Sequence, residues 1–211
     1  MLGMVSARAA AAAPPAPTKP GLRERKKLQT RQAIRRAAHR LFEEHGYDAT
    51  PVDRIAEAAE VSPSTVFRYF PTKEDIVLTD EYDALLEARL RARAADEPVV
   101  ESMRQVTLDT LRGIAEEDRA ALVQRIRLIR EVPAIRGRTA ERTARYAALI
   151  CTVLAERTGR PADDLELRTI SGAILAALQE AMLSWAQQGR TADPEPLVHQ
   201  AMDVLARGLT L

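Results

Sequence analysis

The segment from Ser62 to Asp75 holds two helix starts and one forced helix end, and it constrains the fold more than any other part of the chain. Ser62 followed by Pro63 supplies the N-cap and first-turn residues that begin a helix. That helix has to end by Phe70, because the following proline disfavours a helical conformation in the residue before it. Thr72 then begins another helix, and Asp75 three residues later completes a variant of the capping box.

The residues before Ser62 predict two further helices. Apolar residues recur at three- and four-residue steps from Glu24 to His45, and Gly46 provides a C-terminal stop. Thr50 and Pro51 are then the predicted N-cap and first residue of a short second helix, which a tight turn separates from the third. Two short helices behind a longer one have the spacing of a helix-turn-helix, a unit that places a row of side chains in a groove of DNA.

The third helix can be divided into faces, because each residue turns the helix by about 100°. With Val66 and Phe70 toward the core, Arg68 points directly away, and Ser64 lies about 40° from Arg68. We therefore expect Ser64 and Arg68 to face a groove, where a guanidinium can pair bidentately with guanine.

The flanks of the same helix carry residues suited to the DNA backbone. Phe67 and Tyr69 fall on opposite flanks, near where the two phosphate strands would run, and Thr65 lies between Arg68 and Tyr69. Hydroxyl groups and helix N-termini bind phosphates and set register. Lys73, at the start of the next helix, would add a cation at the rim.

Positive charge is concentrated in the first part of the chain. Residues 19–73 contain 12 Lys and Arg against 7 Asp and Glu, whereas residues 74–211 contain 18 against 23. The formal net charge of +1 therefore conceals two segments of opposite charge. Residues 19–73 are suited to binding a polyanion, and residues 74–211 would be repelled by one. A charge excess is often only a solvated surface, but its position beside the helix pair favours a nucleic acid.

Residues 1–20 form an Ala- and Pro-rich leader that is too poor in large apolar residues to offset the entropy of ordering, so we expect disorder there. The leader passes into Arg23, Arg25, Lys26 and Lys27 just before the first helix. A flexible basic arm of this kind could lie along a phosphate backbone or in a minor groove. A tail that only improves solubility explains the same residues equally well.

Composition favours an all-helical protein. Aromatic residues make up 4% of the 211 residues, and no alternating apolar and polar run predicts a sheet. The single Cys151 cannot form an internal disulfide, and no signal peptide or membrane span is evident, which fits a cytoplasmic protein. The three histidines form no metal-binding motif, and the one carboxylate pair, Asp163-Asp164, is better explained as a helix cap. We expect no catalytic residue, no metal and no cofactor.

The spacing of these residues resembles that of a known family, the TetR family of bacterial transcriptional regulators. The residues that carry the resemblance are Gly46-Tyr47, Thr50, Ile55-Ala56, Val61-Ser62, Thr65-Val66-Phe67, Tyr69-Phe70 and Lys73-Glu74. It is close over roughly residues 24–78 and extends elsewhere only to length and helical character. It implies an N-terminal three-helix DNA-binding domain at residues 21–71. An effector-binding and dimerisation domain of about five or six helices would follow at residues 72–211, giving about nine helices in total.

The resemblance also implies roles for individual residues. Thr65, Tyr69 and Lys73 fall on positions that usually contact phosphate, and Ser64 and Arg68 fall among those that usually read bases. Phe67 stands where a tyrosine is common, which leaves it an apolar contact, for instance with a thymine methyl. Pro63 has no amide hydrogen, so its contact would also be apolar. The complete set of expected DNA-contacting residues is Arg23, Arg25, Lys26, Lys27, Thr50, Ser62, Pro63, Ser64, Thr65, Phe67, Arg68, Tyr69 and Lys73.

The remaining sequence predicts a helical bundle. The expected helices span residues 74–93, 98–115, 118–132, 134–157, 163–188 and 194 onward, with Asp118 as one N-cap. Apolar residues extend around the last two, as in Leu175, Leu178, Met182, Leu183 and Trp185, which suggests one face for the monomer core and another for a partner. The resemblance implies a homodimer through these two helices, with recognition helices about 34–36 Å apart on a near-palindrome. Burial of both faces within the monomer is the alternative.

A ligand cavity in such a bundle would be lined by apolar side chains with a few polar groups. The candidates are Met103, Leu111, Ile126, Tyr146, Cys151, Met182 and Trp185, each of which plain core packing also explains. Cations lie among apolar residues between Arg125 and Arg136, a stretch similar to that of a subgroup with an acyl-CoA-type effector domain, close to the mycofactocin-operon repressor. Arg127 and Arg130 therefore join the candidates. A solvated arginine face paired with acidic neighbours explains this stretch equally well.

These patterns predict a ligand-responsive regulator that binds double-stranded DNA, most simply a repressor. The free homodimer would hold its recognition helices at operator spacing. A small molecule in the bundle, an acyl-CoA or another apolar compound, would move the helix that begins at Thr72 and so destroy that spacing. An activator could use the same parts. A helical adaptor without DNA binding is the third possibility, although no acidic residue replaces Arg68, Tyr69 or Lys73.

Overall fold

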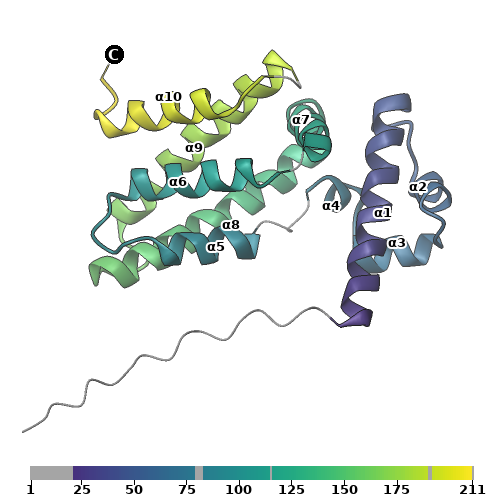
Figure 1. Ribbon diagram of the computed structural model, residues 1–211, viewed down its shortest axis with the longest axis horizontal. Coiled ribbons are helices and arrows are strands. Elements are labelled where there is room, and N and C mark those ends of the chain that lie inside the picture. The colour runs from purple at the N-terminus through teal and green to yellow at the C-terminus, as the bar shows by residue number, and fades with distance from the viewer. Residues whose placement is uncertain (1–20, 79–82, 115, 190–191, 211) are drawn as a thin grey trace, which may run out of the picture.

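The computed structural model describes residues 21–78, 83–114, 116–189 and 192–210, and within them it contains ten α-helices and no strand. The helices are α1 (Leu22–His45), α2 (Val52–Ala58), α3 (Pro63–Tyr69), α4 (Lys73–Val77), α5 (Asp83–Ala92), α6 (Val99–Arg112), α7 (Glu116–Glu131), α8 (Pro133–Thr158), α9 (Leu165–Gln188) and α10 (Glu195–Ala206). Figure 1 shows α1, α2 and α3 as one unit, α5 to α10 as a larger bundle, and α4 between them. The all-helical prediction is confirmed. The predicted leader lies outside the described residues.

The predicted start and stop signals around α3 are confirmed. The Ser62 hydroxyl oxygen accepts a hydrogen bond from the Thr65 amide at 3.2 Å, and Phe70 adopts an extended backbone before the proline. At the start of α4, Thr72 and Asp75 exchange the two hydrogen bonds of a capping box. Because these signals are local, they set both ends of α3 without the need for tertiary contacts.

One predicted helix is divided in the structure. Residues 74–93 were expected to form a single helix, but α4 ends at Val77 and α5 begins at Asp83. Ile76, Val77 and Leu78 are all buried, and they pack in the same cluster as α1, α2 and α3. Three consecutive buried residues need packing on more than one side of a helix, and the N-terminal unit supplies it. This division explains why ten helices are present where about nine were expected.

Thr50 has a different role from the one predicted. Helix α2 begins at Val52, and its N-cap is Pro51, with no side-chain cap. The Thr50 side chain is fully buried, and its hydroxyl lies within hydrogen-bonding distance of the Leu41 carbonyl at 3.3 Å and the Gly46 carbonyl at 2.8 Å. Thr50 therefore closes the C-terminal end of α1 and has no surface to offer to DNA.

Most bundle helices begin and end close to the predicted residues. Gly159 ends α8 in the left-handed conformation, which favours glycine. The Asp164 carboxylate caps α9 by accepting hydrogen bonds from the Glu166 and Leu167 amides. Asp118, a predicted N-cap, instead lies within the first turn of α7, which begins two residues earlier.

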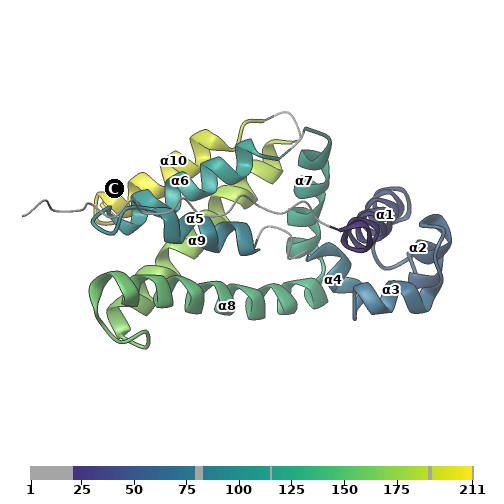
Figure 2. The ribbon, with the colours of Figure 1, turned by 60° about the horizontal axis from the view of Figure 1, so that its bottom comes forward.

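Helices α7 and α8 meet at a corner beside the N-terminal unit. Figure 2 shows α7 and α8 running in different directions from this corner, with α8 along one side of the bundle. Val132 leaves the helical conformation, and Pro133 is the first residue of α8. Because proline cannot continue a preceding helix without losing a hydrogen bond, the corner is a direct consequence of the sequence.

The same corner joins the bundle to the N-terminal unit. Leu128 of α7 and Ile135 of α8 are buried in the hydrophobic cluster formed by α1 to α4. Polar contacts flank this packing. The Gln124 side-chain amide donates to the His39 carbonyl at 2.9 Å, and its oxygen lies 2.5 Å from the His39 ring. Burial lowers the pKa of His39, so the ring is held in its neutral form at this contact.

Among the helices of the described part of the chain, none has both the length and the apolar character needed to cross a membrane.

The buried hydroxyl of Thr50 generates the first prediction. Thr50→Val keeps the side-chain volume but removes the hydrogen bonds to the end of α1, so we expect the free energy of unfolding to fall by about 1–3 kcal/mol. Thr152→Val is the matched control, because the exposed Thr152 hydroxyl bonds only to the Ala148 carbonyl of its own helix. Urea denaturation followed by circular dichroism measures both, and equal losses would contradict the assigned role.

Candidate nucleic-acid interface and bundle cavity

Helix α3 presents opposite faces to the core and to solvent. Val66 and Phe70 are 0% and 1% exposed, and their burial contributes roughly 1.5–3 kcal/mol each. Ser64 and Arg68 are exposed on the opposite face. The predicted division of the helix into a buried pair and an outward pair is therefore confirmed.

The N-terminal end of α3 carries a cluster of hydroxyl groups. The Ser62 hydroxyl lies 2.9 Å from both the Ser64 and the Thr65 hydroxyls. Ser62 and Ser64 are exposed, as is Pro63 between them. Each hydroxyl can donate as well as accept, so the cluster can reorient its protons toward an approaching phosphate.

Arg68 is oriented by its neighbour. Its guanidinium carbon lies 5.5 Å from the centre of the Tyr69 ring, a cation–π distance. Tyr69 itself is half-buried and packs against the core of the N-terminal unit. Phe67, on the other flank, leaves 50% of its surface exposed. The outward face therefore combines the guanidinium of Arg68, which is oriented by Tyr69, with the apolar ring of Phe67.

Lys73 is held more closely than a rim cation would be. Its ammonium donates to the Tyr47 carbonyl and lies 4.0 Å from the centre of the Tyr47 ring. The Tyr47 hydroxyl in turn donates to the Glu74 carboxylate at 2.9 Å. Burial lowers the pKa of Lys73, and burial together with the bond to Glu74 raises the pKa of Tyr47. Lys73 thus ties the start of α4 to the segment that follows α1.

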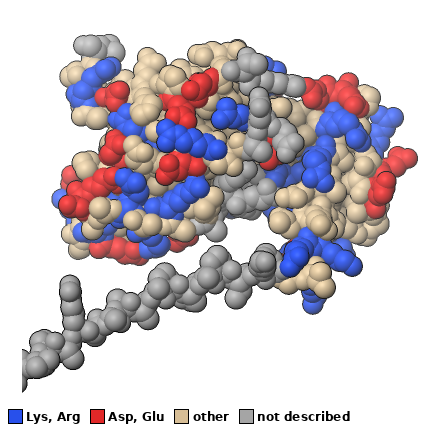
Figure 3. Space-filling model, viewed as in Figure 1, with Lys and Arg blue, Asp and Glu red and all other residues tan. Residues whose placement is uncertain are grey.

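The four basic residues near the N-terminus belong to a helix. Arg23, Arg25, Lys26 and Lys27 are exposed in the first two turns of α1, which begins at Leu22. They were expected to form a flexible arm, and this prediction is wrong, because all four residues belong to the first turns of α1. Figure 3 shows Lys and Arg gathered at this end of the N-terminal unit, whereas both signs of charge are mixed over the bundle.

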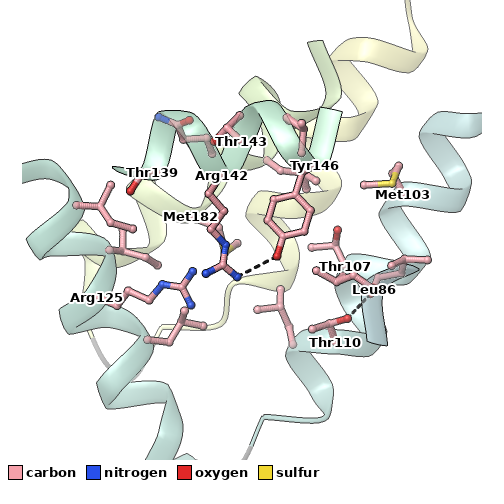
Figure 4. Close-up of a pocket in the computed structure, with 18 of the residues that line it drawn as sticks. Leu86, Met103, Thr107, Thr110, Arg125, Thr139, Arg142, Thr143, Tyr146 and Met182 are labelled. Atoms are coloured by element: carbon pink, nitrogen blue, oxygen red, sulfur yellow. Dashed lines mark hydrogen bonds between the residues drawn. The ribbon is translucent and has the colours of Figure 1, made fainter. Parts of the chain in front are cut away.

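A cavity of about 340 Å³ lies inside the bundle between α5, α6, α7, α8 and α9. Its wall is mostly Leu, Ile, Val and Met, and Figure 4 shows the polar side chains that interrupt it. These polar side chains are Thr107, Thr110, Arg125, Thr139, Arg142, Thr143, Tyr146 and Gln179. An apolar chamber with a few polar groups is typical of a small-molecule site.

Two guanidinium groups reach into this chamber. Arg142 is only 6% exposed, and it donates a hydrogen bond to the Tyr146 hydroxyl at 3.0 Å. Its guanidinium carbon also lies 5.4 Å from the centre of the Tyr146 ring. In Figure 4 the ends of Arg125 from α7 and Arg142 from α8 point toward each other. The chamber therefore has two arginine side chains on one wall.

Of the nine predicted ligand-binding residues, five line this cavity and four do not. Those on its wall are Met103, Leu111, Ile126, Tyr146 and Met182. Arg127 and Arg130 are exposed and border a separate hollow of about 260 Å³ between α7 and α9. Their positions on the outer face of α7 keep them from the chamber, because Ile126 and Ile129 take the inner face.

The other two residues belong to the core. Cys151 is buried with its sulfur 3.3 Å from the Ser171 hydroxyl. Trp185 is fully buried, and its indole N–H donates to the Ala192 carbonyl at 2.7 Å.

The polar residues missed by the sequence analysis had a detectable signal. Thr139, Arg142, Thr143 and Tyr146 follow one another at spacings of three, one and three residues, which places them on one face of α8. A polar stripe on a helix that is otherwise packed indicates a lined chamber or a solvated face, and spacing alone does not separate these two.

The apolar residues that suggested a partner face on α9 are accounted for within the monomer. Leu175, Leu178, Met182 and Leu183 line the cavity, and Trp185 is core. The exposed positions of α9 carry polar and charged residues, such as Arg168 and Glu180, together with the small residues Gly172 and Ala176.

Comparisons with known proteins agree with this architecture. Residues 34–79 match the family described as bacterial regulatory proteins, tetR family, and residues 97–210 match the MftR C-terminal domain. The regulator TcmR of Streptomyces glaucescens is 34% identical over 158 residues, which cover 70% of this chain and 69% of TcmR. The mycofactocin biosynthesis regulator MftR of Mycobacterium tuberculosis is 25% identical over 88% of this chain and 93% of its own length.

A solved structure shares the fold. The crystal structure of Thermus thermophilus FadR, a TetR family transcriptional repressor in complex with lauroyl-CoA, superposes with a TM-score of 0.57 at 24% identity. The superposition covers 86% of this chain and 95% of that one. Together with the helix-turn-helix and the matches over both domains, these findings show that the chain belongs to the TetR family of transcriptional regulators.

Proposed function

We propose that this regulator is a homodimeric repressor that binds a near-palindromic operator and is released by an apolar small molecule in the bundle cavity. The observation that carries the DNA-binding part is the orientation of α3. Val66 and Phe70 anchor the helix to its own domain, and Ser64, Phe67 and Arg68 are left outside. A helix with these two faces presents a short row of side chains to a major groove.

The proposed contacts follow from this orientation. Arg68 and Ser64 read base edges, and Phe67 makes apolar contact with a thymine methyl. Pro63 contacts the same groove without a hydrogen bond. The phosphate contacts come from hydroxyl groups and cations, namely Ser62, Thr65, Tyr69, Lys73, Arg23, Arg25, Lys26 and Lys27.

The proposed dimer uses α9 and α10. The exposed small residues Gly172 and Ala176 of α9 allow another helix to approach closely, because interhelical distance depends on the side chains at the contact. A two-fold axis through such an interface gives the dimer two symmetry-related copies of α3. A near-palindromic operator has the same two-fold symmetry.

The proposed effector site is the cavity enclosed by α5, α6, α7, α8 and α9. The mostly apolar wall supports an apolar body for the effector, and the lauroyl-CoA complex of FadR supports an acyl chain. The cytoplasm, where DNA and metabolites are both present, is the proposed location.

The corner of α7 and α8 is the proposed route from cavity to DNA. On α7, Arg125, Ile126 and Ile129 line the cavity, while Gln124 contacts His39 of α1. On α8, Arg138 lies 3.6 Å from Asp75 of α4. A ligand that shifts either helix would therefore act on α1 through Gln124 or on α4 through Arg138. A coupling of about 1–3 kcal/mol gives a 5- to 150-fold loss of DNA affinity.

One experiment tests the proposal as a whole. Purified protein selects duplexes from a random library, and the selected sequence is titrated in fluorescence anisotropy at several salt concentrations. We expect a near-palindrome, an affinity that falls steeply with salt, and release by a subset of acyl-type compounds. Selection of no sequence would favour the adaptor alternative. Transcription that rises with the bound protein would favour the activator.

Arg68 generates a prediction about specificity. Arg68→Ala should reduce the ratio of affinities for operator and scrambled duplex by roughly 10- to 100-fold, because a bidentate base contact is lost. Lys27→Ala should instead weaken both duplexes equally and reduce the salt slope by about 1. Arg145→Ala, at an exposed position of α8, is the control and should match wild type. If Arg68→Ala and Lys27→Ala changed both duplexes in the same way, the division of roles would be wrong.

Ala176 generates a prediction about assembly. Ala176→Arg should raise the dimer dissociation constant at least roughly tenfold, because a long charged side chain prevents close helix approach. Light scattering coupled to size-exclusion chromatography measures the mass. Ala94→Arg, at an exposed turn after α5, is the control. A dimer that survives Ala176→Arg at micromolar concentration would place the interface elsewhere.

Gln124 generates a prediction about coupling. Gln124→Ala removes the contact with His39 but no cavity side chain, so a releasing compound should bind almost as in wild type and displace DNA several-fold less effectively. Gln105→Ala is matched to it, because Gln105 bonds to Glu101 within one helix. Calorimetry measures compound binding and anisotropy measures DNA release. Loss of both in proportion would show that Gln124 supports the cavity and does not transmit its state.

A further inference from the structure

The threonines within the helices differ in how their hydroxyl groups are used. Beyond the first turn of a helix, a threonine hydroxyl commonly donates to the carbonyl oxygen four residues earlier. Six threonines of the described chain make this bond at 2.7–3.0 Å, namely Thr30, Thr110, Thr139, Thr152, Thr158 and Thr169. A bond to the own helix is therefore the ordinary state of a helical threonine in this protein.

Two helical threonines are exceptions, and both line the bundle cavity. Thr107 lies within α6 and Thr143 lies within α8, so for each of them the residue four positions earlier belongs to the same helix. Within the described residues, neither hydroxyl has a hydrogen-bond partner. Figure 4 shows the two side chains on different walls of the cavity. Both hydroxyl groups are therefore available to a molecule that enters the cavity.

Each of the two exceptions has a neighbour that serves as an internal comparison. Thr110 follows Thr107 by three residues on α6, and Thr139 precedes Thr143 by four residues on α8. All four side chains are half-buried, and all four line the same cavity. Thr110 and Thr139 nevertheless bond to their own helices. A position on the cavity wall therefore does not by itself explain why Thr107 and Thr143 lack this bond.

The two available hydroxyl groups limit the chemistry of a ligand. A hydroxyl can donate to a carbonyl oxygen, and it can donate to or accept from another hydroxyl. A hydrocarbon that filled the cavity would exclude water from both threonines and leave their hydroxyl groups without a partner, which is unfavourable. Because the threonines are neutral, a carbonyl or hydroxyl oxygen is sufficient and no charge is required. The cavity therefore favours an apolar molecule with neutral oxygen atoms over a plain hydrocarbon.

We infer that the cavity binds an apolar molecule that carries carbonyl or hydroxyl groups on two sides and bonds to Thr107 and Thr143 at the same time. This inference rests on the proposed effector site, whose mostly apolar wall contacts the rest of the molecule. Because the two polar contacts lie on different helices, such a ligand links α6 to α8. The class of effector is thereby narrowed from apolar compounds in general to compounds oxygenated at two positions.

The ligand test uses one apolar body with a varying number of hydroxyl groups. Diphenylmethane has none, its para-hydroxy derivative has one, and its di-para-hydroxy derivative has one at each end. Calorimetry measures the binding of each compound to the full-length protein in the absence of DNA. We expect the affinity to rise roughly threefold to tenfold for each hydroxyl, the range of a net hydrogen bond. Equal affinities, or no binding of the dihydroxy compound, would overturn the inference.

Variants of the four cavity threonines identify the hydroxyl groups responsible. Thr107→Val and Thr143→Val keep the side-chain shape, and each should weaken the dihydroxy compound roughly threefold to tenfold without weakening diphenylmethane. Thr110→Val and Thr139→Val are the matched controls and should bind both compounds as wild type does, because their hydroxyl groups bond to their own helices. If a valine variant does not fold, alanine at the same position removes the same hydroxyl. Equal effects at all four positions would contradict the inference.

The outcomes separate this inference from the proposed function. If the dihydroxy compound binds through Thr107 and Thr143 but no duplex is selected from the random library, the inference stands and the proposed repressor fails. If diphenylmethane binds and releases a selected duplex as well as its hydroxylated derivatives do, the inference is overturned and the proposed repressor stands.

Discussion

The packing of α3 and of the bundle corner into one hydrophobic cluster is the constraint on which the rest of the structure depends. Val66 and Phe70 fix the recognition helix from one side of this cluster, and Leu128 and Ile135 enter it from the bundle. The two domains therefore share buried surface and are not joined by a linker alone. Because interiors are close-packed and deform little, a displacement at the corner has to move α1 or α4, which pack against it, or open a void. The architecture is thus suited to transmission between domains.

The DNA-binding unit was largely predictable because its signals are local. Ser62, Pro63 and the proline after Phe70 determine the ends of α3, and the helical period then determines which side chains face outward. Arg68 was therefore placed correctly without tertiary information. Thr50 shows the limit of this reasoning. Its position before a proline is typical of an N-cap, yet the Thr50 hydroxyl bonds to the Gly46 carbonyl at the end of α1 and does not cap α2.

The bundle was less predictable because its decisive features are tertiary. No glycine or proline lies between Lys73 and Arg93, so the end of α4 has no local cause and follows from packing against α1. The apolar residues of α9 were correctly identified as an unusually wide apolar surface, but a chamber and a partner produce the same pattern. Similarly, cations on α7 were expected to serve the ligand. Only Arg125 of that series faces the chamber, and the second arginine comes from a different helix, a pairing that no sequence spacing could reveal.

The proline at the corner has a consequence for the origin of the chamber itself. Pro133 makes the chain change direction after Val132, so α7 and α8 diverge from this point. Their junction packs against the DNA-binding domain. Both helices contribute side chains to the wall of the chamber, and α5, α6 and α9 contribute the rest. A single imino acid therefore sets both the angle between two walls of the chamber and the position at which these walls meet the DNA-binding domain.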